Sequence, residues 1–426
     1  PFSKIFERIL GSQIGSFMND KLSDRLCGFR KGYITQHAPL DLLENWRQHI
    51  DNKKIVGAIF CDLSKAFDTI PHDLLIAKLE AYGFSDESLE FIYDYLRNRK
   101  QRCKIGSAFS TWLQILAGVP QGSVLGPLLF NIFFNDFFFR VLKSDICNFA
   151  DDNSIYSSGK SIAEVASKLV HDMTNAMEWF ENNSMGANPD KFQMMFLGTN
   201  QFSNKCLNIN GMKCITKKAV KLLGINIDWK LNFNSHVDII CTKANRKLKA
   251  LYRLRSKLDF SQKLVLYNSF IMSQFNYCPV IWMFCGQIAN TKIDNILRKA
   301  LQSLYNDFSS NYEELLEKGN HLPIHEINKR HLLVQVYKCI KRENPPFLHH
   351  IFIPKATIHM VLRRNDTLIL PKTSTVSWGL HSFGYRGSRA WNTLPDNIKD
   401  ISSLNIFKSA LKTISLQCTC KLCNRF

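Results

Sequence analysis

The chain has 426 residues, more than a single hydrophobic core usually serves, so we expect two or three domains. Its composition, 45% hydrophobic and 21% charged, excludes a chain that is disordered throughout. Lys and Arg outnumber Asp and Glu by 55 to 36, and the formal net charge of +19 favours a polyanionic partner; a soluble basic protein or a ribosome-associated factor would fit the charge equally well.

The first predicted elements place an acid at the end of a strand. Ile55–Cys61 is a continuous apolar run, typical of a buried strand, and Asp62 follows it directly. Two short helices are expected next, one ending at Gly83 and one beginning with acids at Asp86. Gly118–Gly122 then predicts a loop.

The following segment predicts a helix and then a hairpin with two acids at its tip. Leu125–Phe134 indicates a buried helix with Pro127 in its first turn, where the missing N–H is tolerated. Ile146–Ala150 is mostly apolar, Asp151-Asp152-Asn153 has the composition of a turn, and Ile155-Tyr156 resumes the strand.

Helices dominate the remaining prediction. Ser161–Glu164 has the pattern of a capping box, and apolar residues at helical spacing continue to a stop near Gly186. Asn210-Gly211 predicts a second tight hairpin. From Val237 the periodicity is helical up to about Arg342.

A basic segment lies in the first of these C-terminal helices. Between Cys241 and Lys257 there is no acid, which favours contact with phosphates, although a solvated helix face is the alternative. The cations are Lys243, Arg246, Lys247, Lys249, Arg253, Arg255 and Lys257. Farther along, Asn344-Pro345-Pro346 has the composition of a linker.

Three features bear on location and completeness. The cysteines have no regular spacing and no signal peptide opens the sequence, so we expect reduced thiols and an intracellular protein. The most apolar stretch, residues 270–285, is broken by polar residues and Pro279, which predicts no transmembrane segment. Because residue 1 is Pro and the first residues look like the middle of a folded unit, we expect the sequence to be a fragment.

The predicted strand end and hairpin tip together suggest metal chemistry. Asp62 facing Asp151 and Asp152 would supply hard oxygen ligands on rigid supports, as a pair of Mg²⁺ ions requires for phosphoryl transfer. Adjacent carboxylates repel unless cations neutralise them. Taken alone, however, an Asp-Asp pair more often marks a solvated turn.

Several motifs occur in the order of a known family. Cys61–Asp68 reads CDLSKAFD, Gly118–Pro127 reads GVPQGSVLGP, and Phe149–Asp152 reads FADD. They resemble motifs A, B and C of reverse transcriptases from non-LTR retrotransposons, particularly the jockey-like group. Asn188–Lys191 and Leu222–Ile225 resemble motifs D and E of that family. The likeness also includes two upstream segments and one downstream segment, Lys4–Leu10, Cys27–Gly32 and Arg386–Pro395.

The resemblance implies an α+β right-hand polymerase with fingers and an antiparallel palm sheet, a helical thumb and a basic C-terminal region. It implies RNA-directed DNA synthesis with two Mg²⁺ ions, or Mn²⁺, to copy a retrotransposon RNA. The partners would be an RNA template, a DNA primer and dNTPs, in the nucleus or a cytoplasmic ribonucleoprotein; no oligomeric state is predicted. We expect fingers and palm over residues 1–236, the thumb and connection over 237–345, and the basic region over 346–426.

The resemblance also assigns roles to individual residues of the predicted palm. Asp62, Asp151 and Asp152 would bind the metals together with the backbone carbonyl of Leu63. Lys191 would donate a proton to the leaving pyrophosphate, although an ordinary surface lysine is the alternative.

Other residues would contact the nucleotide and the primer. Phe67 would exclude a ribose 2′-hydroxyl, or else be a core residue. Gln121 would lie against the nucleotide and Gly122 would let the backbone approach it, although Pro120–Gly122 also reads as an ordinary turn. Arg30, with Lys31, is a candidate for gripping the triphosphate, or is solvated charge. Leu223 and Gly224 would form the primer grip.

Other features point away from further activities. Beyond Pro345 the only acids are Asp366, Asp396 and Asp400, too few for a two-metal ribonuclease H site. Two candidate ligand groups, Cys418-Thr419-Cys420-Lys421-Leu422-Cys423 and His349-His350, lack the remaining ligands of a structural zinc site. Two rival functions are a remnant that binds nucleic acid without catalysis and an RNA-templated RNA polymerase; the intact acids argue against the first, and Phe67 with the FADD motif against the second.

Overall fold

The computed structural model describes residues 2–188, 191–202, 204–355, 367–414 and 416. The chain forms two compact units. Unit 1 comprises residues 1–38 and 53–218, and unit 2 comprises residues 39–52 and 219–426. The domain boundaries expected from the sequence, at residues 236 and 345, stay predictions.

Unit 1 combines long helices with short strands. Its helices are α1 (Phe2–Met18), α3 (His72–Ala81), α4 (Asp86–Leu96), α5 (Leu125–Phe134), the 3₁₀ helix η1 (Asn135–Arg140) and α6 (Ile162–Asn182). Its strands are β1 (Ile55–Cys61), β2 (Leu63–Ser64), β3 (Lys100–Gln101), β4 (Lys104–Ile105), β5 (Ala108–Phe109), β6 (Leu113–Gln114), β7 (Asp145–Phe149), β8 (Asp152–Gly159), β9 (Gly186–Ala187), β10 (Gln193–Leu197), β11 (Cys206–Ile209) and β12 (Met212–Ile215).

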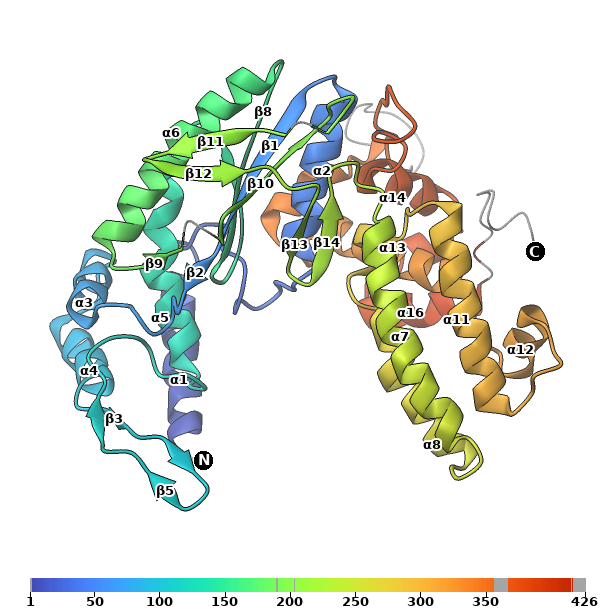
Figure 1. Ribbon diagram of the computed structural model, residues 1–426, viewed down its shortest axis with the longest axis horizontal. Helices are drawn as coiled ribbons and strands as arrows, with labels where there is room; N and C mark the ends of the chain where they lie inside the picture. Colours follow the sequence, from blue (N-terminus) through green and yellow to red (C-terminus); the bar gives the residue numbers. More distant parts are fainter. Residues whose placement is uncertain (1, 189–190, 203, 356–366, 415, 417–426) are drawn as a thin grey trace. The chain divides into compact units, whose positions relative to one another are not determined.

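A four-stranded antiparallel sheet in the order β10-β1-β8-β7 forms the centre of unit 1. Helix α6 runs along this sheet (Figure 1). The approach is close at Gly57 of β1, where an added Cβ would lie 2.7 Å from Val165 Cγ1 and 2.9 Å from Leu169 Cδ1 of the helix. Any larger residue would push the helix from the sheet, which explains a glycine in the middle of a buried strand.

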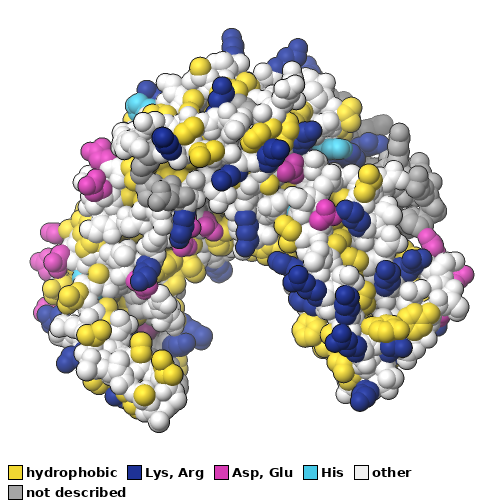
Figure 2. Space-filling view, viewed as in Figure 1, with side chains coloured by type: hydrophobic (Ala, Val, Ile, Leu, Met, Phe, Trp, Pro, Cys, Tyr) yellow, Lys and Arg dark blue, Asp and Glu magenta, His cyan; other side chains and the backbone are white. Residues whose placement is uncertain are grey.

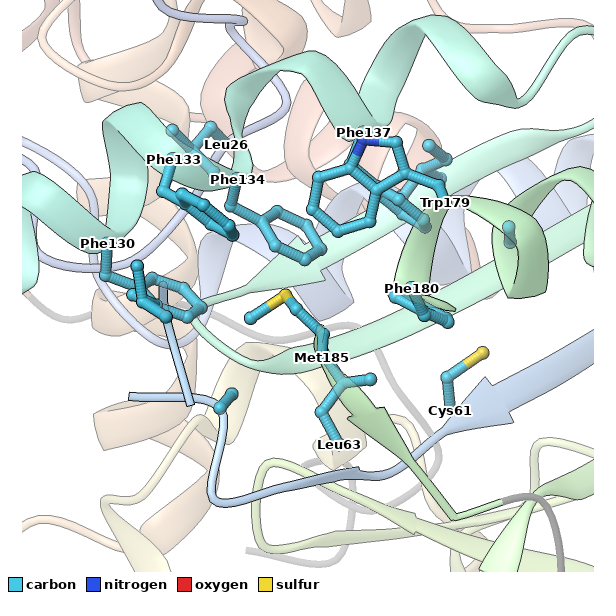
Figure 3. Packing of buried hydrophobic residues seen from close by; sticks show 14 of the residues in the cluster. Leu26, Cys61, Leu63, Phe130, Phe133, Phe134, Phe137, Trp179, Phe180 and Met185 are labelled. Carbon is cyan, nitrogen blue, oxygen red and sulfur yellow. The ribbon is translucent and has the colours of Figure 1, made fainter. Parts of the chain in front are cut away.

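Aromatic rings fill the core of unit 1 beside the sheet. Figure 3 shows Phe133, Phe134 and Phe137 gathered around Trp179 of α6. The ring centroids of Phe134 and Phe137 are 4.7 Å apart, and those of Phe137 and Trp179 are 5.1 Å apart. All four side chains are buried, so this cluster fixes α5 and η1 against the helix that covers the sheet.

The elements predicted for unit 1 are largely confirmed. Strand β1, helices α3, α4 and α5, and the hairpin β11–β12 form where the sequence placed them. The hairpin β7–β8 also forms, but its turn is Ala150-Asp151 rather than Asp151–Asn153, because Asp152 and Asn153 pair with Phe149 and Asn148 in the ladder. Helix α6 ends at Asn182 rather than near Gly186, because Asn183 folds its amide back onto the carbonyl of Trp179. Half of the expected capping box forms: Ser161 accepts from the Glu164 N–H, while the Glu164 carboxylate accepts from the Lys160 N–H.

Unit 2 is mainly helical. Its strands are β13 (Ala219–Leu222) and β14 (Ile225–Asp228). Its helices are α2 (His37–Asp51, from Pro39 onward), α7 (Asn234–Leu254), α8 (Phe260–Leu266), the π-helix η3 (Tyr267–Met272), α9 (Ser273–Phe275), α10 (Pro279–Trp282), α11 (Gln287–Tyr305), α12 (Tyr312–Lys318), α13 (Ile324–Ile340), the 3₁₀ helix η4 (Pro346–Ile351), α14 (Phe383–Asn392), α15 (Asp396–Lys399) and α16 (Leu404–Thr413).

Helix α2, distant in sequence, holds the C-terminal segment of unit 2. The Glu44 carboxylate accepts from the N–H groups of Phe383 and Gly384 at the start of α14, at 2.7 and 3.0 Å. The Asp51 carboxylate accepts from the N–H groups of Ser374 and Thr375, at 2.8 and 2.7 Å. Buried acids thereby satisfy backbone donors that would otherwise lack partners.

The segment Asn344–Pro346 differs from its prediction. Asn344–Pro346 was expected to be a linker, which is wrong: Asn344 and Pro345 are buried, and the Asn344 carbonyl accepts from His349 Nε2 at 2.7 Å. The α+β class, the antiparallel palm sheet and the helical character of the thumb segment are confirmed. Within the described ranges no helix is long and apolar enough to cross a membrane.

Candidate active site

Strand register brings the predicted metal ligands to one end of the central sheet. In the β1–β8 ladder the last pair is Cys61 with Asn153, so Asp62 and Asp152 are the next residues of the two strands at that end of the sheet. In the β7–β8 ladder Phe149 pairs with Asp152, which leaves Ala150 and Asp151 as the turn. Because adjacent strands are about 4.8 Å apart, the backbone positions of the three acids lie at the same end of the sheet although they are far apart in sequence.

Two buried asparagines hold the turn that carries Asp151 and Asp152. The Asn148 Nδ2 donates to the carbonyl of Ala150 at 2.8 Å and to Asn153 Oδ1 at 2.9 Å. The Asn153 Nδ2 donates to the carbonyl of Asp151 at 3.0 Å. These hydrogen bonds join Asn148 of β7 and Asn153 of β8 to the two turn residues, Ala150 and Asp151. Ala150 has a positive φ of 55° in this turn.

A loop from the fingers segment is joined to the same turn. The Ala150 N–H donates to the Cys27 carbonyl at 2.7 Å, and the Cys27 N–H donates to Asn148 Oδ1 at 3.1 Å. Gly28 has a φ of 110°, and a Cβ there would lie 2.7 Å from the Ala150 nitrogen. Only glycine allows this approach, which gives a structural reason for the Cys27-Gly28 pair.

The acidic side chains are accessible, and a lysine lies beside them. The Asp62 side chain is 54% exposed, Asp152 is exposed and Asp151 is half-buried. Lys191 Nζ lies 3.8 Å from Asp62 Oδ2. Within the described part of the chain, no three His, Cys, Asp or Glu side chains are arranged to hold a metal ion.

Phe67 sits five residues after Asp62 and takes part in a chain of rings. Its ring is stacked on Phe130 with centroids 4.2 Å apart, and it meets Phe29 edge-on at 5.8 Å. Phe67 is half-buried, whereas Phe130 behind it is fully buried. The core therefore supports one face of the ring and leaves part of it accessible.

The Gly118–Gly122 loop is fastened to the segment that follows Asp62. Gln121 Nε2 donates to Asp68 Oδ1 at 2.7 Å, and a Cβ on Gly118 would lie 2.7 Å from the Asp68 backbone. Gly122 has a φ of 78° with nothing near its Cβ position, so its backbone conformation rather than a lack of space requires glycine. Gln121 is exposed at this point.

Arg30 is partly engaged within its own loop. Its Nη1 donates to the carbonyl of Ser23 at 2.7 Å, and its guanidinium lies 4.6 Å from the centre of the Tyr33 ring. Lys31 beside it is exposed. The role of Arg30 in gripping a triphosphate stays a prediction.

The predicted primer grip is a tight turn in unit 2. Leu223 and Gly224 join β13 to β14 with φ values of 47° and 81°, as a two-residue hairpin turn requires. The Tyr277 hydroxyl donates to the Leu223 carbonyl at 2.6 Å and lies against Gly224. Burial, with a smaller effect of Cys278, raises the pKa of Tyr277 to about 12, so the hydroxyl stays a donor at neutral pH.

The basic residues predicted for the thumb lie on α7 and just after it. Figure 2 shows Lys and Arg side chains gathered over this helix. The exposed ones are Lys243, Arg246, Lys249, Arg253 and Lys257, while Lys247 and Arg255 are half-buried. Arg255 stacks on Tyr252, with its guanidinium 3.7 Å from the ring centre. The opposite face of α7 is buried, so the helix has one apolar and one cationic side.

Some predicted features lie outside the described residues. These are Pro189 and Asp190 of motif D, the acid Asp366, and the cysteine group Cys418, Cys420 and Cys423. The downstream segment Arg386–Pro395 is described and packs in unit 2. There Trp391 is buried with its ring centroid 5.9 Å from that of Phe407, and a Cβ on Gly387 would lie 2.7 Å from Phe352 Cζ.

Comparison with known protein families identifies the group to which this geometry belongs. The family model described as reverse transcriptase (RNA-dependent DNA polymerase) matches residues 2–227, more than half of the chain. The chain belongs to the reverse transcriptase family. Members of this family use divalent metal ions, which agrees with acids at one end of the palm sheet.

Similar proteins come from fruit-fly transposons. In Drosophila melanogaster, the probable RNA-directed DNA polymerase from transposon BS is 26% identical over 316 residues, which cover 71% of this chain and 35% of that protein. The corresponding protein from transposon X-element is 29% identical over 289 residues, 66% of this chain and 32% of that protein. The RNA-directed DNA polymerase from mobile element jockey is 26% identical over 315 residues, 71% of this chain and 34% of that protein.

These relatives confirm the resemblance to jockey-like reverse transcriptases. The chain spans about a third of the length of the curated relatives it matches. Among solved structures, telomerase from Candida albicans in complex with a fragment of telomeric RNA has a TM-score of 0.42 and 12% identity, covering 76% of this chain and 59% of that one.

Proposed function

We propose that this reverse transcriptase chain adds deoxynucleotides to a DNA primer on an RNA template, copying a retrotransposon RNA in the nucleus or a cytoplasmic ribonucleoprotein. The observation that supports the proposal is the strand register, which ends at Cys61 and Asn153 just before Asp62 and beside Asp152, with Asp151 in the adjoining turn. Family membership supports the same reaction.

The acids at the sheet end fit a divalent cation site. Asp62, Asp151 and Asp152 would hold two Mg²⁺ ions, or Mn²⁺, with the Leu63 carbonyl as a backbone ligand. Their accessible side chains must rotate toward one another, because as they stand they do not form a metal-binding group among the described residues. When bound, the ions would lower the pKa of the primer 3′-hydroxyl and offset charge on the phosphate oxygens.

The side chains around the acids would orient and select the nucleotide. Phe67 is held by the core on one side, so its accessible edge would exclude a ribose 2′-hydroxyl by steric conflict. Gln121, fixed by Asp68, would lie against the incoming nucleotide where Gly122 lets the backbone approach.

Cations would act on the phosphates and on the nucleic acid. Lys191 lies beside Asp62, with 3.8 Å between Nζ and Oδ2. From this position it would donate a proton to the leaving pyrophosphate. Arg30 would bind the triphosphate if its guanidinium left the Ser23 carbonyl. In unit 2, Leu223 and Gly224 would support the primer end, and the cationic side of α7 would follow the phosphates of the hybrid.

Primer extension with the full chain tests the proposal. We expect Mg²⁺-dependent extension with dNTPs on an RNA template and little extension with ribonucleotides. Asp151→Asn should abolish extension and retain template binding, because it removes a proposed metal ligand and no basic contact. Asp145→Asn, an exposed acid at the other end of β7, is the matched control and should extend normally.

Each alternative function predicts a different result. A folded wild-type chain that binds RNA but extends no primer would favour a remnant without catalysis. Efficient incorporation of ribonucleotides would favour an RNA polymerase. Normal extension by Asp151→Asn would refute the metal role of that acid.

A further inference from the structure

A hairpin between Arg99 and Leu116 projects from unit 1 without a core of its own. Strand β3 pairs with β6, and β4 pairs with β5 at its tip. Two further hydrogen bonds join its arms, from the Ser110 N–H to the Cys103 carbonyl at 3.0 Å and from the Ile115 N–H to the Arg99 carbonyl at 2.8 Å. Every residue from Arg99 to Gln114 is exposed. An isolated two-stranded hairpin is only marginally stable in water. The large side chains of this hairpin are exposed, so they do not form a hydrophobic core that would stabilise it.

Exposed rings and cations alternate on this 99–116 hairpin. The Phe109 side chain is 50% exposed and Trp112 is 57% exposed. The Arg102 guanidinium carbon lies 4.0 Å from the centre of the Phe109 ring and 4.6 Å from that of Trp112. Lys104 Nζ lies 5.2 Å from the centre of the same Phe109 ring. Arg102 and Lys104 are therefore both close to the exposed aromatic side chains of the hairpin. Cation–π contact keeps the charges close to the rings while leaving both open to solvent.

The charged residues within the hairpin itself are all cations. No Asp or Glu occurs between Asp94 and Asp136, whereas Arg99, Lys100, Arg102 and Lys104 are concentrated in one arm. Arg and Trp are also enriched at protein interfaces, so an acidic protein surface is the alternative partner. A hairpin with cations, accessible aromatic rings and no acid is suited to single-stranded nucleic acid. The cations can neutralise its phosphates, and its unpaired bases can stack on the rings.

The base of the hairpin is joined to the nucleotide side of the candidate site. Ala117 bridges to Pro71, and the Gly118 N–H donates to the Ile70 carbonyl at 2.8 Å. His72 Nε2 is hydrogen-bonded to the Gly118 carbonyl at 2.8 Å. The arm that carries Trp112 therefore continues directly into the loop that presents Gln121, within unit 1.

We propose that the 99–116 hairpin binds single-stranded nucleic acid, with bases stacked on Trp112 and Phe109 and phosphates neutralised by Arg102 and Lys104. That the strand is the RNA template rests on the function proposed above. Binding itself does not, since it requires neither the acids nor a nucleotide. Stacking tolerates any base, so the hairpin would hold the strand without reading its sequence.

Binding measured without nucleotide separates this proposal from the polymerase activity. Fluorescence anisotropy of a labelled single-stranded RNA of mixed sequence gives the affinity of the full chain, and a blunt RNA duplex serves as the second probe. Loss of one stacking platform in Trp112→Ala should weaken single-strand binding by about fivefold to a hundredfold. Duplex binding should be nearly unchanged, because its bases are stacked on one another. Trp112→Phe should restore most of the affinity.

The charge contribution has its own readout and control. Removing two cations in Arg102→Gln with Lys104→Gln should lower the slope of log affinity against log salt by about 1.4, or 0.7 for each phosphate contact. Lys53→Gln with Lys54→Gln removes the same charge from another exposed turn of unit 1 and should leave the slope nearly unchanged. Thermal unfolding should match wild type for all variants, since the hairpin lies outside the core.

The RNA-binding measurements on the hairpin variants decide for or against the proposal. Loss of single-strand binding by a folded Trp112→Ala chain supports the proposal even where primer extension is absent in wild type. Wild-type affinity in both hairpin variants overturns it. A change in oligomeric state without a change in RNA affinity also overturns it and makes the hairpin a protein-binding surface.

Discussion

Asn148 provides the sharpest test of how the catalytic turn is held. The side chain is 1% exposed and makes three hydrogen bonds, to the Cys27 N–H, the Ala150 carbonyl and Asn153 Oδ1. Asn148→Ala leaves three buried groups without this partner. Each such group costs about 1–3 kcal/mol, so we expect a loss of at least about 3 kcal/mol. For a unit of this size that lowers Tm by roughly 6–12 °C.

The same change should impair catalysis in protein that remains folded. Without the amide, the turn is free to shift, and a displacement of about 1 Å at reacting groups reduces the rate by about a hundredfold. Single-turnover primer extension, measured well below the Tm, should show this loss with template affinity unchanged.

Asn183→Ala is the matched control, because it removes a buried asparagine whose side-chain amide donates to the Trp179 carbonyl at the end of α6, outside the β7–β8 turn. It should lower Tm with little effect on the rate. A folded Asn148→Ala chain with the wild-type rate would refute the positioning role.

Three further predictions concern selectivity, the primer and pH. Phe67→Ala should admit ribonucleotides in primer extension, and unchanged sugar selectivity would make Phe67 only a core residue. Tyr277→Phe removes the 2.6 Å hydrogen bond to Leu223 and should raise the KM for primer–template several-fold with kcat nearly constant; a fall in kcat alone would contradict this reasoning. Burial, with the charge of Glu313, raises the pKa of Asp294 from 3.8 to about 6. Since the folded state disfavours the charged acid, wild-type stability should fall between these pH values as pH rises. Asp294→Asn should therefore be more stable than wild type above about pH 6, by about 1 kcal/mol because partial exposure weakens the effect, and equally stable near pH 4. Equal thermal unfolding of the two chains at both pH values would refute this.

Local pattern was sufficient to predict much of unit 1. The apolar run of β1 and the turn composition near the tip of β7–β8 depend on neighbours in sequence, and both elements formed, although the turn lies one residue earlier than expected. The two short helices before and after Gly83 also form, and each buries leucines, among them Leu75 and Leu89.

The contacts that hold the site were not predictable in this way. Asn148 and Cys27 are 121 residues apart, and no periodicity indicates that they meet. A polar residue, Asn148, within the buried middle of β7 was an available signal. Likewise, the pairing of Gln121 with Asp68 depends on how two loops pack.

The linker prediction failed for a related reason. Asn344-Pro345-Pro346 has the local composition of a connection, yet tertiary packing buries Asn344 and its carbonyl binds His349. The composition of a segment indicates which backbone conformations it can adopt. Whether the segment is buried depends on the elements that pack against it.

Mn²⁺ binding, followed by electron paramagnetic resonance, tests the central claim most directly. The sample is the full chain with a dideoxy-terminated primer on RNA and the next matching dNTP. We predict two bound Mn²⁺ ions in the wild-type complex and a loss of both when Asp62, Asp151 and Asp152 are all changed to Asn. Equal Mn²⁺ binding by the wild-type and substituted complexes, with primer–template still bound, would contradict the account.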